Sequence, residues 1–582
     1  MKQRIFAILL SLTMMFTLVP TAWAAGGESE APAMRGDCGA VGSENSVQWA
    51  LTDDDGDGSY TLTISGSGAM ADYTANINNT KATQPWRAGE TGVEIEKITK
   101  VVVSENVTSI GAFAFNGLTA VSEYDIGANV STINQWALDT SAAKVFNLNG
   151  NTNFKTDDGV LFNVDGTTLI AYPGGSAVRD EYTVPSTVTA IADGAFVGCP
   201  IKKLTIGNNV TTVLPSWSFN GGVLEELDVN CPFDRSTFAQ ITTLKKVTLR
   251  NSITEIPEMA FLNCTGLQTV SIPSGLTKIG TQAFFGCSSL QNVTLPESLT
   301  EIGYQAFRDC DALTSITFPD SLERVGEQAF LITESAGHTG SLTTVTFGAK
   351  IPSFRTSSGT TSTSPQLFKG QNQLKTVDMS KCKNTKISAG LFDGLTALET
   401  IIFPTGLTEI GDRAFTNCSG LTSLEFPDSL TKIGDSAFSG CTGLTYISYG
   451  SGIDDIGGNA FGGCTGVKVI DLHRAEKIGE TYDNGSHNGD PALTHACIQT
   501  AREVKYYLRT VNQANSVKGN LEWGNGVAGG GNISNAYYIL TATDAVPDYT
   551  GETGTPTRAV YTFDKWEAVN VSQGSTTTKN VY

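Results

Sequence analysis

The sequence predicts a β-rich solenoid, in which short strands from successive coils run parallel and stack along one axis. A pattern of apolar residues recurs every 23 residues in the clearest part of the chain. Gly is abundant, with 62 residues, and charged residues make up only 16%, a composition typical of turn-rich β structure. We expect a signal peptide at 1–24, an N-terminal β-hairpin cap at 25–97, the solenoid at 98–480 and a small C-terminal β module at 481–582.

The N-terminal segment has the three parts of an export signal. Lys2 and Arg4 supply a positive start, a short apolar run follows, and Ala22-Trp23-Ala24 has the small-x-small pattern of a cleavage site. A transmembrane anchor is the alternative, but the run is too short and a polar, Gly-rich stretch follows it. We therefore expect cleavage near Ala24, and a mature chain that is secreted or held non-covalently at the cell surface, without membrane insertion.

The cap region alternates apolar and polar residues around a turn, which predicts a β-hairpin that covers the open end of the first coil. In the turn, Asp53-x-Asp55-x-Asp57-Gly58 matches the first half of a calcium-binding loop, whose alternate carboxylates converge on the ion. The twelfth position of such a loop is here Ile64 and not Glu. A solvated hairpin turn is therefore the favoured interpretation, and we predict no metal site.

The repeat is clearest in two blocks, which start at Leu267 and Leu398. One unit reads Leu267-x-x-Val270-x-Ile272-Pro273-x-x-Leu276-x-x-Ile279-Gly280-x-x-Ala283-Phe284-x-x-Cys287. Its first part predicts a strand with inward apolar side chains, which the proline ends because it has no N–H to donate. Leu-x-x-Ile predicts a second inward segment, and Gly permits the corner. One coil cannot bury its own apolar edges, so neighbouring coils must stack into one continuous core.

Cysteines follow the same interval, which bears on their chemistry. Eleven cysteines in an exported chain normally suggest disulfides. Six of them, however, recur once per unit: Cys264, Cys287, Cys310, Cys418, Cys441 and Cys464. We predict that these side chains form a ladder of small, buried hydrophobic groups, with disulfides as the alternative. Cys38, Cys231, Cys382 and Cys497 lie off this ladder, and the sequence leaves their pairing open.

Two segments interrupt the repeat. Residues 154–173 contain Asp-Gly turns between apolar runs, which predicts a hairpin inserted between units. Residues 352–366 are rich in Ser and Thr and poor in apolar side chains, which predicts an exposed loop.

The repeat unit resembles the BspA-type (Treponema pallidum-type) leucine-rich repeats of bacterial surface proteins. The resemblance covers residues 98–480 and implies a right-handed leucine-rich repeat array with parallel strands. It also implies binding of extracellular ligands, including host or matrix proteins, without naming the ligand. The segment from Val546-Pro547 to Trp566 resembles small β repeats of other bacterial surface proteins, which serve as stalks or spacers.

Charge and motifs exclude several classes of function. The formal net charge of −20 should repel nucleic acids and anionic membranes, so neither is an expected partner. The four histidines make no His-Glu-x-x-His pattern, and no Gly-x-Ser-x-Gly or phosphate-binding loop occurs. We therefore predict no catalytic residues, no cofactor and no enzyme activity.

The outward face of the strand array is the best candidate for binding, because its residues alternate with those of the core. Threonine is also simply a good strand former, which explains much of this surface without a ligand. The C-terminal half of the face adds aromatic and aliphatic side chains suited to protein or glycan contact. The candidate residues are Thr400, Ile402, Ser423, Glu425, Tyr446, Ser448, Tyr449 and Asp471.

Three functional hypotheses follow from these observations. The leading one is an extracellular scaffold that binds a protein or glycan and serves in adhesion. The second is a cell-envelope structural or spacer protein that binds nothing. The third is an enzyme with an unrecognised catalytic site in the C-terminal region, which would need a convergent acid/base or nucleophile set.

Overall fold

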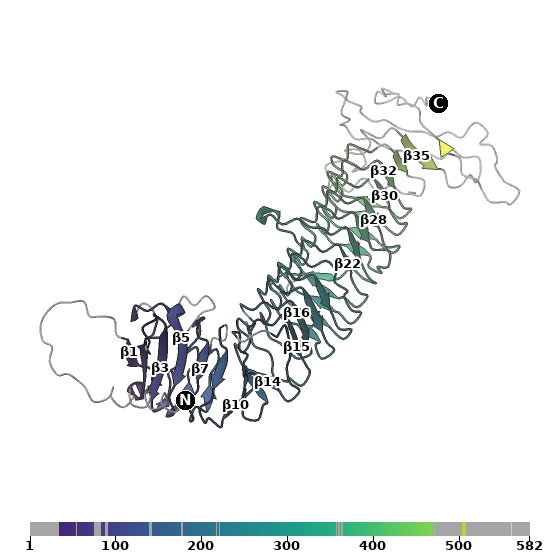
Figure 1. Cartoon of the computed structure of the whole chain (residues 1–582). Coiled ribbons are helices and arrows are strands. Elements are labelled where there is room, and N and C mark those ends of the chain that lie inside the picture. The colour runs from purple at the N-terminus through teal and green to yellow at the C-terminus, as the bar shows by residue number, and fades with distance from the viewer. Residues whose placement is uncertain are drawn as a thin grey trace, which may run out of the picture.

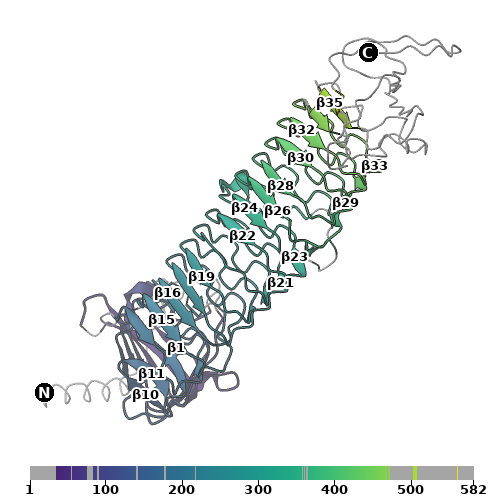
Figure 2. The ribbon, with the colours of Figure 1, turned by 90° about the vertical axis from the view of Figure 1, so that its right-hand side faces the viewer.

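The chain winds into a long β-solenoid whose coils stack along one axis (Figures 1 and 2). The computed structural model describes residues 34–471, apart from 54, 75–82, 88–90, 139–141, 176–178, 217, 220, 357, 359–360, 362–364 and 468, and the backbone of 503–507 and 560–561. The predicted signal peptide lies outside the described residues, as does the predicted C-terminal module except for two strands. Helical structure in the described part is limited to Thr91 and the 3-10 turns η1 (Glu44–Ser46), η2 (Ile95–Lys97) and η3 (Glu334–Ala336). The predicted β-rich solenoid is thus confirmed.

Strands on one side of the coils form a row that we call the main sheet. Its first part contains β1 (Arg35–Asp37), β2 (Val47–Thr52), β3 (Tyr60–Gly66), β5 (Ile98–Val103), β7 (Glu123–Asp125) and β9 (Val145–Asn147). The second part contains β13 (Glu181–Thr183), β15 (Lys203–Ile206), β16 (Glu226–Val229), β17 (Lys246–Leu249) and β19 (Thr269–Ser271). The third contains β22 (Ser315–Thr317), β24 (Thr344–Thr346), β26 (Thr376–Asp378) and β28 (Thr400–Ile402). The last contains β30 (Ser423–Glu425), β32 (Tyr446–Ser448), β34 (Val469–Asp471), β35 (Glu503–Tyr507) and β36 (Val560–Tyr561).

A second row of shorter strands follows the Leu-x-x-Ile segments. It begins with β4 (Gly68–Ala69), β6 (Val107–Ile110) and β8 (Thr132–Ile133). Next come β10 (Phe154–Asp157), β11 (Val160–Asn163), β12 (Thr168–Ala171) and β14 (Ala190–Ile191). Then follow β18 (Glu255–Ile256), β20 (Lys278–Ile279), β21 (Glu301–Ile302), β23 (Arg324–Gly326) and β25 (Ser353–Arg355). The row ends with β27 (Lys386–Ile387), β29 (Glu409–Ile410), β31 (Lys432–Ile433) and β33 (Asp455–Ile456).

The register of both rows places equivalent residues of neighbouring coils side by side. Val247 pairs with Val270 in the main sheet, and Ile279 pairs with Ile302 in the second row. The leucines that open the clear units, Leu267, Leu290 and Leu313, are all buried. Each coil therefore covers the apolar edge of the next, as the 23-residue pattern predicts.

Phenylalanine rings and cysteine thiols form two further ladders inside the solenoid. Phe261, Phe284, Phe307 and Phe330 stack with centroids 5.2–5.3 Å apart and ring planes within 9° of parallel. The Cys287 thiol donates to the Phe261 carbonyl oxygen of the preceding coil at 3.2 Å, and each of the other ladder cysteines donates likewise to the phenylalanine carbonyl 26 residues before it. All ten cysteines in the described residues are buried and none of them forms a disulfide, which confirms the thiol ladder; Cys497 lies outside them.

The N-terminal cap contains the predicted hairpin. β2 and β3 pair antiparallel, with Trp49 opposite Ile64, and β3 then pairs parallel with β5 of the first coil. Trp86 is fully buried between Trp49 and Phe115, so the cap and the first coils share one core.

The segment predicted as an inserted hairpin has a larger role than an insertion. β10, β11 and β12 form a three-stranded antiparallel sheet, and β12 then pairs parallel with β14, so the chain rejoins the second row. Lys155, Thr156 and Asp157 of β10 are exposed, whereas β11 buries side chains on both of its faces. Leu161 and Ala171 belong to the core of the cap and first coils, whereas Phe162 and Leu169 belong to the core of the later coils. We call β10–β12 the partition sheet, because it separates two hydrophobic cores.

The prediction of an exposed loop at 352–366 is wrong for its first part. Residues 353–355 form β25, which pairs with β23, and Phe354 is buried in the core. One apolar residue among Ser and Thr was enough to dock the strand, because the second row needs only one inward side chain per coil.

No helix in the described part of the chain has the length and apolar character needed to cross a bilayer.

Candidate functional site

The outward face of the main sheet consists of two side-chain columns per strand. In β19, Val270 points into the core while Thr269 and Ser271 are exposed, and strands such as β22, β24 and β30 repeat this alternation. We call the position before the inward residue the first column, and the position after it the second column. Residues of one column lie side by side along the axis: Ser315 pairs with Thr344, and Thr344 with Thr376.

Four candidate residues occupy this face as predicted from the sequence. Thr400 and Ser423 lie in the first column, and Ile402 and Glu425 in the second, and all four are exposed. The Ile402 side chain is 42% exposed, which is unusual for a large aliphatic residue of the chain. Tyr446 is half-buried and pairs with Ser423, so the structure brings these two candidates together.

The prediction that Ser448 and Tyr449 face outward is wrong. Ser448 is only 3% exposed, and Tyr449 is fully buried against Phe426 and Phe461, with ring centroids 5.5 and 6.1 Å away. Tyr449 follows Phe426 by one repeat of 23 residues, so it occupies a position that points inward in every regular coil. Asp471 lies in β34 opposite Ser448, and its side chain is outside the described residues.

Charge is distributed unevenly along the face. On β15 to β17 the exposed residues form ion pairs between neighbouring coils, with Lys245 2.7 Å from Glu225 and Lys203 2.9 Å from Glu181. Exposed pairs of this kind contribute less than about 1 kcal/mol each, but they leave a charged surface. Charge returns at β26 and β28, where Lys375 lies 3.0 Å from Glu399.

Between these charged regions lies a surface without any charged side chain, which the sequence analysis did not single out. Ten of its twelve residues are exposed, and Thr344 and Thr346 are half-buried. We call it the neutral patch; its residues are Gln268, Thr269, Ser271, Gln291, Asn292, Thr294, Thr314, Ser315, Thr317, Thr343, Thr344 and Thr346. The signal was present in the sequence, because the residues flanking each inward strand position carry no Lys, Arg, Asp or Glu over these four coils.

The acidic turn of the cap has the geometry of a hairpin turn. Oxygens of Asp53, Asp55 and Asp57 lie within 4.8 Å of one another on the surface. Both carboxylate oxygens of Asp53 accept backbone N–H groups, from Gly56 at 2.7 Å and from Gly58 at 3.1 Å. These bonds account for the position of Asp53 without an ion.

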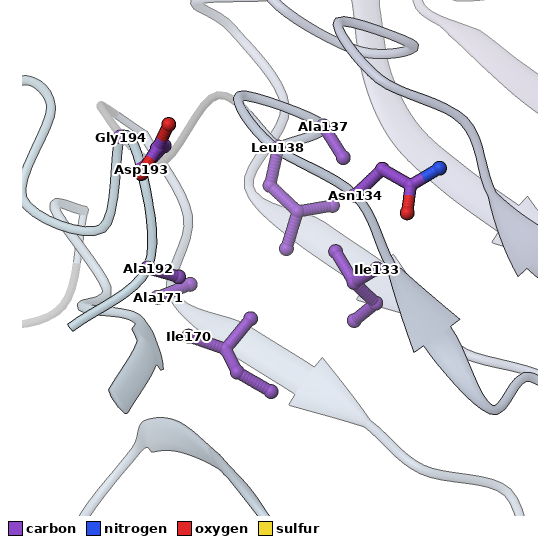
Figure 3. A pocket seen from close by; sticks show the side chains of 9 residues that line it. All are labelled: Ile133, Asn134, Ala137, Leu138, Ile170, Ala171, Ala192, Asp193 and Gly194. Carbon is purple, nitrogen blue, oxygen red and sulfur yellow. The ribbon is translucent and has the colours of Figure 1, made fainter. Parts of the chain in front are cut away.

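A small hollow lies where the partition sheet meets the first coils (Figure 3). It offers about 10 Å³, room for a single water molecule and not for an organic substrate. Asp193 lines it beside Asn134 and Leu138, and partial burial raises the pKa of the Asp193 carboxyl above its usual value. One carboxyl group among mostly apolar neighbours does not make an acid/base pair.

Comparisons with known proteins agree with the resemblance found in the sequence. A family model described as the BspA type leucine-rich repeat region matches in six copies, at residues 93–173, 178–253, 232–358 and 361–486. The search of curated proteins gave no match to this chain.

Solved structures with a similar fold come from several bacteria. A leucine-rich repeat protein from Bacteroides ovatus is 20% identical, with 73% of this chain and 92% of that chain covered and a TM-score of 0.45. One from Eubacterium ventriosum is 24% identical, with coverage of 49% and 92% and a TM-score of 0.33. The leucine-rich repeat protein of T. pallidum is 20% identical, with coverage of 50% and 86% and a TM-score of 0.22.

The family model covers more than half of the sequence, and the stacked coils described above are the fold that its repeats predict. This chain belongs to the family of BspA-type leucine-rich repeat proteins.

Proposed function

We propose that this protein is an extracellular binding scaffold that presents the outward face of its main sheet to a protein or glycan, and that it catalyses no reaction. The observation that carries the proposal is the exposed double column of side chains, which continues from coil to coil while the apolar side chains point inward. A long, rigid face of this kind suits recognition of an extended partner, because its side chains are held by the core and lose little freedom on binding.

The proposal includes a location. The chain would be exported, cleaved near Ala24, and then released or held at the cell surface by non-covalent contacts. The segment at 1–24 supports this, since it has the positive start, apolar run and small-x-small end of a signal peptide. N-terminal sequencing of the protein from culture medium and from a salt wash of whole cells would test it; a first residue near Ala25 is expected.

The test of binding uses the mature chain, residues 25–582, as bait for extracellular matrix proteins and for a glycan array. A variant carrying Ile402→Arg and Ser423→Arg places two bulky charges on the exposed face and should weaken retention of a face-bound ligand at least about tenfold. The matched control is Thr431→Arg, at an exposed position beside the second row, which should leave retention unchanged.

Two outcomes would contradict the proposal. Equal retention by all three proteins would remove the part of the main sheet around Ile402 and Ser423 as the binding face. If no ligand is retained at micromolar concentration and the protein remains tightly bound to cell walls, the spacer hypothesis replaces it.

A further inference from the structure

We infer that the neutral patch binds an uncharged polysaccharide chain that lies along the solenoid axis. This inference rests on the proposed function and narrows it to one ligand class and one part of the main sheet. The patch lies midway along the solenoid, between β19 and β24 (Figure 2).

The chemistry of the patch is uniform. Each of its residues ends in a hydroxyl or a carboxamide, groups that both donate and accept hydrogen bonds. The chain as a whole has a formal net charge of −20, yet these four coils present no charge between Lys246 and Lys375 on this face. An ionic partner would find nothing to pair with here, and an anionic one would be repelled by the rest of the protein.

A protein partner is also a poor fit for this surface. Protein interfaces depend on a few buried aromatic, Arg or aliphatic anchors surrounded by a polar rim. The neutral patch offers no aromatic or aliphatic anchor of its own, since its inward neighbours Val270, Ile316 and Val345 are all buried. The partner that matches a polar, uncharged and anchor-free surface is one that is itself rich in hydroxyl groups.

Hydrogen bonds within the patch arrange its groups for such a partner. The Thr343 hydroxyl donates to the Thr314 carbonyl oxygen at 3.1 Å, which leaves its oxygen lone pairs free to accept. The Thr314 hydroxyl donates to the Asn292 amide oxygen at 3.4 Å. This bond does not use the N–H donors of the Asn292 amide group. The patch therefore presents both acceptors, on the threonine hydroxyls, and donors, on the Asn292 amide.

The spacing of the coils suits a polymer and not a single sugar. Strand neighbours lie about 4.8 Å apart, so equivalent polar groups recur at that interval along the axis. Thr269 is bridged to Asn292 and Asn292 to Ser315, and Ser315 pairs with Thr344 in turn, so the column is continuous over the patch. Each contact competes with water and is weak, and only a chain that engages several coils at once gains affinity by multivalency.

Retention on insoluble neutral polysaccharides tests the inference, with cellulose, mannan, starch and a β-1,3-glucan as probes and the mature chain as the protein. The variant carries Thr317→Val, Thr344→Val and Thr346→Val, which removes three hydroxyls and keeps β-branched side chains. The control carries Thr205→Val and Thr248→Val, in the same second column but beside the ion pairs of β15 to β17. Both variants should keep the wild-type melting temperature, because all five positions lie on the solvent side of the sheet.

We expect at least one polysaccharide to retain the wild type and the control, and the patch variant to be retained at least about tenfold less. Retention should stay unchanged when salt rises from about 0.05 to 0.5 M, because no charges take part. Soluble oligosaccharides of that polymer should compete better as they lengthen.

Three results would overturn the inference: no retention on any neutral polysaccharide, equal retention of the patch variant and the wild type, or retention that salt abolishes. Capture of a protein ligand that Ile402→Arg and Ser423→Arg weaken, without any polysaccharide retention, would overturn it as well and would leave the proposed function standing. Failure of both assays would remove the proposed function too.

Discussion

Equivalent side chains recur in successive coils of this molecule, and each of them has nearly the same surroundings. Cys264 shows the consequence for chemistry. Burial raises the pKa of its thiol from the ordinary 9.0 to about 12, and the thiol is hydrogen-bonded to the Phe238 carbonyl oxygen at 3.0 Å. The reactive thiolate is therefore scarce at neutral pH, so a buried ladder thiol of this kind is expected to be unreactive.

This pKa shift predicts a loss of stability at alkaline pH. Above pH 9 the unfolded chain releases the thiol proton while the folded chain keeps it, so stability falls as the pH rises from about 9 to about 12. Each such thiol adds a slope of up to about 1.4 kcal/mol per pH unit. Urea unfolding between pH 8.5 and 10 should give a shallower slope for Cys264→Ala than for the wild type. Identical slopes would contradict the prediction, whatever the absolute stability of the variant.

The phenylalanine ladder predicts a different kind of sensitivity. Phe284 is fully buried between Phe261 and Phe307, so Phe284→Ala leaves a cavity that neighbouring coils cannot fill and should cost about 3–5 kcal/mol. The adjacent Phe285 is half-buried, with the Arg308 guanidinium 5.3 Å from its ring centroid. Phe285→Ala is therefore the matched control and should cost much less. Denaturant unfolding followed by circular dichroism compares the two, and similar losses would argue against the inward ladder.

At the scale of the element, each coil turns a corner against the backbone of the coil before it. Gly303 is the clearest case. A Cβ atom added there would lie 2.5 Å from the Gly280 carbonyl carbon and from the Thr281 nitrogen, which are backbone atoms with no freedom to move aside. The glycine of the repeat is therefore required by close approach of two coils, and not only by the turn itself.

This contact predicts different effects for two alanine substitutions in neighbouring repeats. Gly303→Ala should destabilise the solenoid by about 1–3 kcal/mol, because the backbone of one coil must shift away from its neighbour. Gly275 has no atom within 4 Å of an added Cβ, so Gly275→Ala should be neutral or stabilising by about 0.4–1 kcal/mol through the unfolded state. Thermal melting of both variants checks the pair; a destabilised Gly275→Ala protein would show that the corner argument is mistaken.

At the scale of the whole molecule, coils touch only their neighbours, so stability is close to a sum of local terms. The partition sheet is an exception, because it separates two hydrophobic cores. Adjacent residues of β11 belong to different cores: Leu161 packs with the cap and first coils, and Phe162 packs with the later coils. The molecule should therefore behave as two cooperative units that meet at 154–171.

Hydrogen exchange measured by mass spectrometry tests this division. Leu161→Ala should raise exchange mainly in residues 98–147, and Phe162→Ala mainly in residues 181–249, with a local loss of about 2–5 kcal/mol in each case. The two variants are each other's control, since they truncate neighbouring buried side chains of one strand. Exchange that rises equally on both sides in both variants would mean a single cooperative core.

The sequence alone determined the solenoid, the inward positions of the regular coils, the hairpin of the cap and the buried ladder of six cysteines. All of these follow from side-chain direction within one coil, which a strict spacing of apolar residues fixes. The same spacing places Tyr449 one repeat after Phe426 and so indicates that it is buried. The prediction that Tyr449 faces outward did not use this interval and was wrong.

Only the tertiary structure decided which residues of different coils become neighbours. The intervals from Ser315 to Thr344 and from Thr344 to Thr376 are 29 and 32 residues, so the continuity of the face across irregular coils depends on strand pairing and not on the repeat. The partition sheet likewise could not be predicted, because β11 is buried on both faces, and a short apolar run does not say which core each face will join. Local patterns fix the direction of a side chain, whereas its partners depend on contacts between distant parts of the chain.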